Sequence, residues 1–445
     1  MTDKTVNYLK GKVAIFAVGM ALTVMCFHSC EDNSNNNFDG TPYDPSKPVT
    51  LESFEPDSGG MATKVFINGK NFGTDLTQIK VYFNDLRAPV VGSDGEHIYA
   101  ITPRQPGREC TISVVVNNDS VSFTNKTYLY RTLTTVTTIA GKKGTTEFKP
   151  GTLAEATFDH PSTLCVDREG NIFLSHWRVP YTFVLINQEN DLVQELPVNN
   201  EPLGAPTPDS DGKVISAPTD GGDGYFSFDP DAQWAPKRRL ILHPNEELIA
   251  GGMLDFSINY KHGMSACLAN GYIYTRSYNG QLVRFNPITR SGERVGTLLL
   301  EPSTDAFMTF DPYKHEILYI SYPSRHCIYT FNINTGEHTL FAGTRGTAGW
   351  KDGERLQSEF NNPVQVTVDQ DGSVIVADMN NHCIRKISPD GMVSTVIGKG
   401  TVAGYVDGNP EDALFNHPKG VAIDKDFNIY VADYDNNVVR KLAIE

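Results

Sequence analysis

The chain has 445 residues, and its 38 Lys and Arg against 53 Asp and Glu give a formal net charge of −15 at pH 7. This length allows more than one folded core. The acidic balance argues against binding to nucleic acid or to an anionic membrane surface, because both repel negative charge.

Residues 1–29 are typical of a lipoprotein signal peptide. Basic residues precede an apolar run at 13–27, which is shorter than the roughly 20 residues of a membrane-spanning helix. The run is followed by Ser29 and Cys30, a pair similar to a bacterial lipobox. We therefore expect Cys30 to become the lipidated first residue of the mature protein. Phe27 and His28 depart from the lipobox pattern, so an ordinary cleaved signal peptide is the alternative.

Residues 30–48 are expected to form a flexible tether. They are rich in Asn, Asp, Ser and Pro, and such a segment buries too little apolar surface to order itself. The acidic pair Glu31 and Asp32 resembles the surface-export signal of Bacteroidetes lipoproteins. This resemblance implies an outer-membrane protein that faces the cell exterior and touches the membrane only through its lipid anchor.

Residues 49–131 are expected to form a β-sandwich, because polar and apolar residues alternate and turn signals recur. The stretches 54–60, 65–73, 81–83 and 113–116 resemble an IPT/TIG domain, which is an immunoglobulin-like module. In surface lipoproteins this module usually acts as a spacer, so the resemblance implies the same role here.

Residues 132–445 contain repeats, which decide the fold of this part. The segment Phe-Asn-Asn-Pro at 360–363 recurs as Phe-Asn-His-Pro at 415–418, and Phe-Asp-His-Pro at 158–161 is an earlier copy. These copies resemble NHL repeats. Three degenerate copies are expected to have their second strands at 214–216, 272–274 and 317–319.

The predicted fold is therefore all-β, an immunoglobulin-like β-sandwich followed by a six-bladed β-propeller, because six four-stranded units suit a closed ring. The last repeat ends without a fourth strand, whereas the segment at 136–141 matches the fourth strands of other repeats. We expect this segment to complete the C-terminal blade, which would remove two exposed sheet edges.

One face of the propeller is expected to hold a ligand. The loops between second and third strands, and the long loops between blades, emerge together on that face. They bring together aromatic, Arg, Asn and His side chains, which suit stacking on sugars and hydrogen bonding to hydroxyls. Trp350 and Tyr405 rank second, because NHL repeats often carry an aromatic residue there for packing. The candidate ligand-binding residues are Trp177, Arg178, Tyr181, Tyr225, Tyr278, Arg325, Trp350 and Tyr405.

No catalytic, cofactor or metal-binding motif is expected. The sequence contains no HExxH, GxSxG or P-loop pattern. Paired aspartates such as Asp369 and Asp371 fall in hairpin turns, where Asp accepts backbone hydrogen bonds. Five cysteines beyond the anchor are widely spaced and are expected to be buried as small apolar residues. They are Cys110, Cys165, Cys267, Cys327 and Cys383.

The whole layout resembles the surface glycan-binding proteins of Bacteroidetes polysaccharide-utilisation systems. That resemblance implies capture of an oligo- or polysaccharide beside the components of an outer-membrane transporter, without enzymatic activity. Two alternatives stay open. One is a propeller enzyme similar to lactonases or lyases, which use a metal in the channel, and the other is a scaffold for protein–protein interaction.

Overall fold

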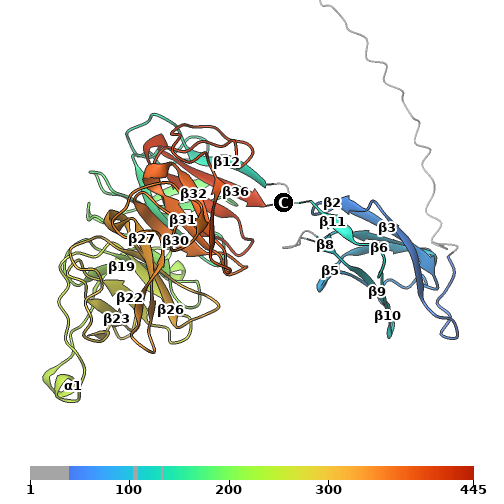
Figure 1. The fold of residues 1–445 in the computed structure, drawn as a ribbon, viewed down its shortest axis with the longest axis horizontal. Coiled ribbons are helices and arrows are strands. Elements are labelled where there is room, and N and C mark those ends of the chain that lie inside the picture. The colour runs from blue at the N-terminus through green and yellow to red at the C-terminus, as the bar shows by residue number, and fades with distance from the viewer. Residues whose placement is uncertain (1–39, 104–108, 132–133, 445) are drawn as a thin grey trace, which may run out of the picture.

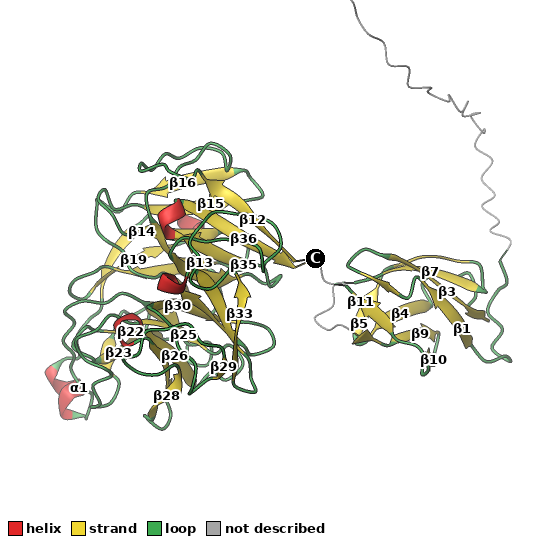
Figure 2. Cartoon of the chain, turned by 45° about the horizontal axis from the view of Figure 1, so that its top comes forward, coloured by secondary structure: helices red, strands yellow, loops and turns green. Residues whose placement is uncertain are grey.

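The computed structural model describes residues 40–103, 109–131 and 134–444. It confirms the all-β prediction, since strands dominate and the described residues contain one short α-helix, α1 (Glu246–Ala250) (Figure 2). No helix in the described part of the chain has the length and apolar character needed to cross a membrane. The predicted signal peptide and the predicted lipid site at Cys30 lie outside the described residues.

The N-terminal β-sandwich contains two four-stranded sheets and a small third sheet. Alternate residues of its strands point inward, as Val65 and Ile67 of one sheet and Val81 and Val114 of the other do, and these four side chains are fully buried. The first sheet is β1 (Thr50–Glu55), β3 (Lys64–Lys70), β7 (His97–Ile101) and β6 (Val90–Ser93). The second is β10 (Asp119–Ser122), β9 (Ile112–Val116), β4 (Ile79–Phe83) and β5 (Leu86–Ala88), and the third is β2 (Ser58–Gly59), β11 (Tyr128–Tyr130) and β8 (Glu109–Cys110).

The prediction of an unordered tether does not hold for residues 40–48. The Thr41 N–H donates to the Asp94 carbonyl at 2.8 Å. The Asp44 N–H donates to Asn71 Oδ1 at 2.7 Å, and Asn71 Nδ2 donates back to the Asp44 carbonyl at 2.9 Å. Polar residues of this segment thus find partners on the sandwich, and composition alone gave no sign of these long-range bonds.

The remaining strands form six sheets arranged as the blades of a propeller. The innermost strands of successive blades contact one another, and β34 contacts β13, so the ring is closed. Blades 1 to 3 are β13 (Pro161–Val166), β14 (Ile172–His176), β15 (Phe183–Asn187), β16 (Leu192–Leu196); β17 (Thr207–Pro208), β18 (Ile215–Pro218), β19 (Gly224–Phe228), β20 (Lys237–Leu240); and β21 (Met264–Ala266), β22 (Ile273–Arg276), β23 (Leu282–Phe285), β24 (Gly292–Arg294).

Blades 4 to 6 include the two clearest repeats. The second strands expected in the degenerate copies are confirmed as β18, β22 and β26. These blades are β25 (Phe307–Phe310), β26 (Ile317–Tyr322), β27 (Cys327–Asn332), β28 (His338–Ala342); β30 (Pro363–Val368), β31 (Val374–Asp378), β32 (Cys383–Ile387), β33 (Met392–Ile397), with the short β29 (Gly353–Glu354) at the edge; and β34 (Pro418–Ile423), β35 (Ile429–Asp433), β36 (Val438–Ile444), β12 (Thr134–Gly141).

The predicted closure of the ring by the N-terminal strand is confirmed. Strand β12 pairs antiparallel with β36, and Val136 lies opposite Leu442. In Figure 1 the teal β12 lies beside the red β36, although the two are at opposite ends of the propeller sequence. Val136 is 1% exposed and packs in an apolar cluster shared by blades 5 and 6.

Neighbouring blades are also joined by side chains that follow the second strands. A 3-10 turn follows that strand in blades 4, 5 and 6, as η2 (Pro323–Arg325), η3 (Met379–Asn381) and η4 (Tyr434–Asn436). The next residue has a left-handed backbone, which Asn and His adopt more readily than most residues. Its side chain accepts a hydrogen bond from a backbone N–H of the loop that enters the next blade. These bonds run from Asn362 to His326, from His417 to His382 and from His160 to Asn437.

The five cysteines of the described residues are all buried and free, as expected. Burial raises the pKa of the Cys327 thiol to about 12. Cys165 and Cys267 pack in apolar clusters between blades. They therefore act as small core residues.

Candidate functional site

The candidate site is a pocket of about 210 Å³ at one mouth of the propeller channel, called here the channel-mouth pocket. It lies where the innermost strands begin, on the face that carries the loops between second and third strands. The residues that line it come from several blades. Among those used below are Trp177, His262, Asp305, Lys419 and Tyr434, and Thr163 of β13 also lines the pocket.

Trp177 and Tyr434 occupy equivalent places in neighbouring blades. Trp177 directly follows β14 of blade 1, and Tyr434 directly follows β35 of blade 6. Pro323 and Met379 follow the second strands of blades 4 and 5, and they also line the pocket. In these four blades the residue after the second strand thus faces the pocket, and blades 1 and 6 place aromatic rings there.

Lys419 lies between these two aromatic side chains. It is the second residue of β34, and its ammonium lies 5.5 Å from the ring centroid of Trp177 and 5.0 Å from that of Tyr434. Burial lowers the pKa of Lys419 to about 8, and the negative charge of Asp305 opposes this shift. The amine therefore keeps its positive charge near pH 7, and the electron-rich ring faces stabilise that charge.

His262 also lines the pocket, and two carboxylates lie near its ring nitrogens. Its Nδ1 lies 3.3 Å from Asp305 Oδ1, and its Nε2 lies 3.4 Å from Asp220 Oδ1. The rings of His262 and Trp177 meet edge to face at 5.5 Å. His262 and Asp305 come just before β21 and β25, so each reaches the channel from the loop that enters its blade.

Gln365 separates the channel-mouth pocket from the lower channel. From β30, its Nε2 donates to the Leu164 carbonyl at 2.6 Å, and its Oε1 accepts from the N–H groups of Leu164 at 3.1 Å and Val421 at 3.2 Å. A second cavity of about 230 Å³ lies further along the channel, among later residues of the inner strands. The amide therefore links three blades and forms a polar layer beneath the channel-mouth pocket.

A small histidine cluster supports Tyr434 at the rim. Asp435 lies 2.6 Å from His417 Nδ1 through one oxygen and 3.6 Å from His160 Nε2 through the other. The His160 ring meets the Tyr434 ring edge to face at 4.8 Å. These contacts hold Tyr434 in addition to its contact with Lys419, so the protein itself supports this aromatic ring of the pocket.

The sequence-predicted residues are only partly brought together here. Trp177 lines the pocket, whereas Arg178, which is exposed, and Tyr181, which is half-exposed, lie outside its lining. Tyr225 is 1% exposed and packs against Phe285 with 4.8 Å between ring centroids. Its prediction as a ligand residue must be corrected, because the side chain points from β19 into the core between blades.

Tyr278 and Arg325 also lie outside the pocket lining. The Tyr278 backbone bonds to the Tyr260 carbonyl, and the two rings meet edge to face at 6.4 Å. Arg325 Nε lies 3.7 Å from Glu301 Oε2. Contacts within the protein thus account for both side chains, and ligand binding by either stays a prediction.

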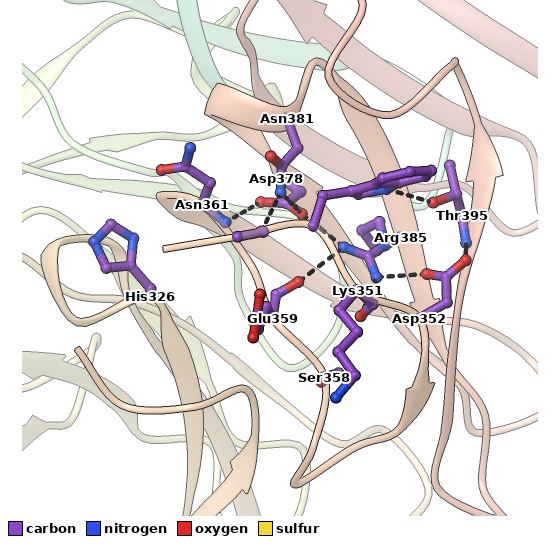
Figure 3. Close-up of polar contacts among 12 residues, drawn as sticks. His326, Lys351, Asp352, Ser358, Glu359, Asn361, Asp378, Asn381, Arg385 and Thr395 are labelled. Carbon is purple, nitrogen blue, oxygen red and sulfur yellow. Dashed lines mark hydrogen bonds and ion pairs between the residues drawn. The ribbon is translucent and has the colours of Figure 1, made fainter. Parts of the chain in front are cut away.

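A buried arginine holds the loop of Trp350. Arg385 is fully buried and donates to Asp378 at 2.9 Å and to Asp352 at 2.5 Å (Figure 3). Asp352 is two residues after Trp350, so this ion pair fixes the loop on blade 5. The Trp350 indole N–H donates to Thr395 on the outer strand at 3.1 Å. Trp350 is 46% exposed and lies outside the pocket lining.

Blade 6 repeats this arrangement around Tyr405. Arg440 is fully buried and donates to Asp433 at 3.2 Å and to Asp407 at 2.5 Å. The Tyr405 hydroxyl lies 2.9 Å from the hydroxyl of Thr138, on the closing strand. Packing within the protein therefore accounts for Trp350 and Tyr405, and neither residue lines the channel-mouth pocket.

The sequence-based candidates omit most of the pocket lining, including His262, Asp305, Lys419 and Tyr434. Lys419 had a usable signal, since the equivalent residue 55 positions earlier is Val364. A Lys at a position where the neighbouring repeat has an apolar residue indicates that this side chain does not serve the apolar core. His262 and Asp305 belong to degenerate repeats, whose sequences could not be aligned with the clear repeats residue by residue.

Comparison with known proteins supports both parts of the fold. Residues 49–130 match the IPT/TIG domain model, and residues 360–387 match the NHL repeat model. The chain is 42% identical over 84 residues to NHL repeat-containing protein 2 of Gallus gallus, which is 19% of this chain and 11% of that protein. It is 24% identical over 318 residues to Protein SUPPRESSOR OF QUENCHING 1, chloroplastic, of Arabidopsis thaliana, covering 68% of this chain and 27% of that one. The chain thus spans about a quarter or less of these relatives.

Solved structures from Bacteroides share the fold along most of the chain. A protein of unknown function from Bacteroides thetaiotaomicron VPI-5482 aligns with a TM-score of 0.78 and 27% identity, covering 91% of this chain and 100% of that one. Auxiliary nutrient binding proteins from Bacteroides ovatus ATCC 8483 and from Bacteroides thetaiotaomicron VPI-5482 align with TM-scores of 0.62 and 0.60. Their identities are 24% and 22%, and the alignments cover 91% of this chain and 100% and 99% of theirs.

Proposed function

We propose that this chain is an outer-membrane lipoprotein that faces the cell exterior and captures a glycan in the channel-mouth pocket, as part of a polysaccharide-uptake system. The observation that carries the proposal is the pair of aromatic side chains, Trp177 and Tyr434, at equivalent positions on one pocket. Aromatic rings beside hydrogen-bonding side chains are the chemistry by which proteins bind sugars. Structural neighbours described as auxiliary nutrient binding proteins agree with such a role.

The pocket dimensions favour recognition of one end or one branch of a glycan. Its volume of about 210 Å³ is smaller than the roughly 300–1,000 Å³ of pockets that enclose drug-sized ligands. A longer chain would therefore extend over the rim, toward the exposed Arg178 and the half-exposed Tyr181. Binding without chemical conversion is part of the proposal.

A paired substitution tests this function. Trp177→Ala should lower affinity for a bound polysaccharide by about 1–3 kcal/mol, the scale of an aromatic anchor at a binding site. Its melting temperature should change little, because Trp177 is only half-buried. Affinity electrophoresis against a polysaccharide panel, followed by calorimetry, measures the effect. Trp350→Ala is the matched control, since that tryptophan lies outside the pocket, and equal affinities for both variants would contradict the proposal.

His262 favours one second candidate, a propeller enzyme. An imidazole with carboxylates 3.3 and 3.4 Å from its two ring nitrogens is suited to general acid–base catalysis. Such an enzyme would release products from a glycan that it binds, and His262→Ala would stop product release while binding persisted. Chromatography of the glycan after prolonged incubation separates the two functions, because a binding protein returns it unchanged.

A further inference from the structure

We propose that the ligand of the channel-mouth pocket carries an anionic group, a uronate carboxylate or a sulfate ester, which binds Lys419. This inference rests on the proposed glycan-binding function and specifies the class of glycan. Its basis is a positive charge that the protein places in the pocket and leaves unneutralised.

Lys419 lacks a polar partner within the described residues. Its ammonium approaches the Trp177 and Tyr434 rings at 5.5 and 5.0 Å, but no described side chain or carbonyl forms a hydrogen bond or ion pair with it. A cation removed from water is costly unless it is paired. A bound anion would supply the missing partner and offset the cost of partly removing the ammonium from water. We therefore expect acidic ligands to bind more tightly than neutral ones.

Three fully buried cations of the propeller, Arg385, Arg440 and Lys261, have polar partners within the protein. Arg385 and Arg440 each contact two carboxylates. The Lys261 ammonium donates to the carbonyls of Thr219 at 2.8 Å and Gly222 at 2.5 Å. These three side chains hold loops together, whereas Lys419 holds none.

The fold itself does not require a lysine at position 419. The equivalent residue of the preceding blade is Val364, which lines the same pocket and is 2% exposed. An apolar side chain is therefore compatible with this backbone position. At this position of the pocket wall, Lys419 has a charged group where Val364 has an apolar one. A role in binding a ligand would explain this difference.

The acidic groups nearby leave the Lys419 charge available. Asp305 and Asp220 both lie against His262, at 3.3 and 3.4 Å, and neither forms an ion pair with Lys419. The pocket thus has a cationic side at Lys419 and a side rich in hydrogen-bond acceptors at Asp305. An acidic sugar would place its anionic group at the first and its hydroxyl groups at the second.

The test measures binding of matched acidic and neutral oligosaccharides to the full chain. The probes are oligogalacturonate, which carries carboxylates only, and oligosaccharides of a sulfated galactan without uronic acid, which carry sulfate esters only. The carboxyl-reduced and the desulfated forms are the neutral counterparts. We expect the acidic forms to bind at least tenfold more tightly, and the better of the two distinguishes carboxylate from sulfate. Lys419→Met should remove that preference, and Lys419→Arg should keep part of it, because Arg offers a planar donor fork to the same anions.

The matched control is Lys441→Met. Lys441 also lies over an aromatic ring, with 5.5 Å to the Tyr430 centroid, but it is outside the pocket lining. Its substitution should leave the preference intact. Melting curves confirm folding of each variant, and Lys419→Met should melt no lower than the parent because it removes a partly buried charge that has no polar partner among the described residues.

The outcomes distinguish this inference from the proposed function. If Trp177→Ala weakens binding of acidic and neutral forms alike while Lys419→Met changes neither, the anionic specificity is wrong and glycan capture stands. If no glycan binds the parent, or if Trp177→Ala changes nothing, both proposals fail. Loss of acidic binding in Lys419→Met, with neutral binding retained, supports both.

Discussion

Charged side chains are used in two different ways in this propeller. Asp433 and Arg440 are both fully buried, and Asp433 also accepts from the Asn416 N–H and from Asn436 Nδ2, each at 2.8 Å. Burial raises the pKa of Asp433 to about 7, although its three donors oppose that shift. This pair joins the loop that enters blade 6 to the strands of the same blade, whereas Lys419 is left open to the pocket.

Asp433→Asn should destabilise the propeller strongly. It removes the buried anion that faces Arg440, and breaking one side of a buried ion pair costs roughly 3–5 kcal/mol. Asp407→Asn is the control, because Asp407 is 41% exposed and water replaces it in part. Urea unfolding of both variants measures the free energies, and a loss in Asp433→Asn no larger than in the control would show that the buried pair is not needed.

The closing strand is the element on which the ring depends. β12 supplies the outer strand of blade 6, and without it β36 would expose an unpaired edge. Its inward residues enter the cores on both sides, as Val136 does in the cluster of blades 5 and 6 and Ala140 in that of blades 6 and 1.

Val136→Asp should weaken this closure. The substitution loses about 1.5–3 kcal/mol of apolar burial and adds the cost of burying a charge, so the melting temperature should fall clearly. Thr135→Asp, one residue earlier on the exposed side of the same strand, is the matched control. Calorimetry that gave the two variants the same melting temperature would mean that closure contributes little to stability.

At the scale of the whole molecule, the proposed anchor determines where the pocket meets its ligand. We expect Cys30→Ala to move the protein from the membrane fraction to the soluble fraction, since a lipid chain is the only proposed attachment. Cys26→Ala is the control, because Cys26 lies in the predicted signal peptide and leaves with it. Retention of the Cys30→Ala protein on membranes, measured by fractionation and blotting, would refute the lipid anchor.

The sequence alone determined the fold class, the repeats and the closing strand. These features depend on local patterns, because strand alternation and turn residues follow from backbone hydrogen bonding and burial within one repeat. It also pointed to Trp177, whose loop departs from the repeat and which lines the channel-mouth pocket. The same local logic misplaced Tyr225, since a tyrosine near a loop gave no indication that its ring points into the core.

Only the tertiary structure decided which side chains share a site. Trp177, His262, Asp305 and Lys419 come from four blades and meet because the closed ring brings the starts of the inner strands to one channel mouth. The tertiary structure likewise places residues 40–48 against the sandwich, through the hydrogen bonds between Asp44 and Asn71. Such contacts depend on how six sheets pack around an axis, and that packing leaves no periodic trace in the sequence.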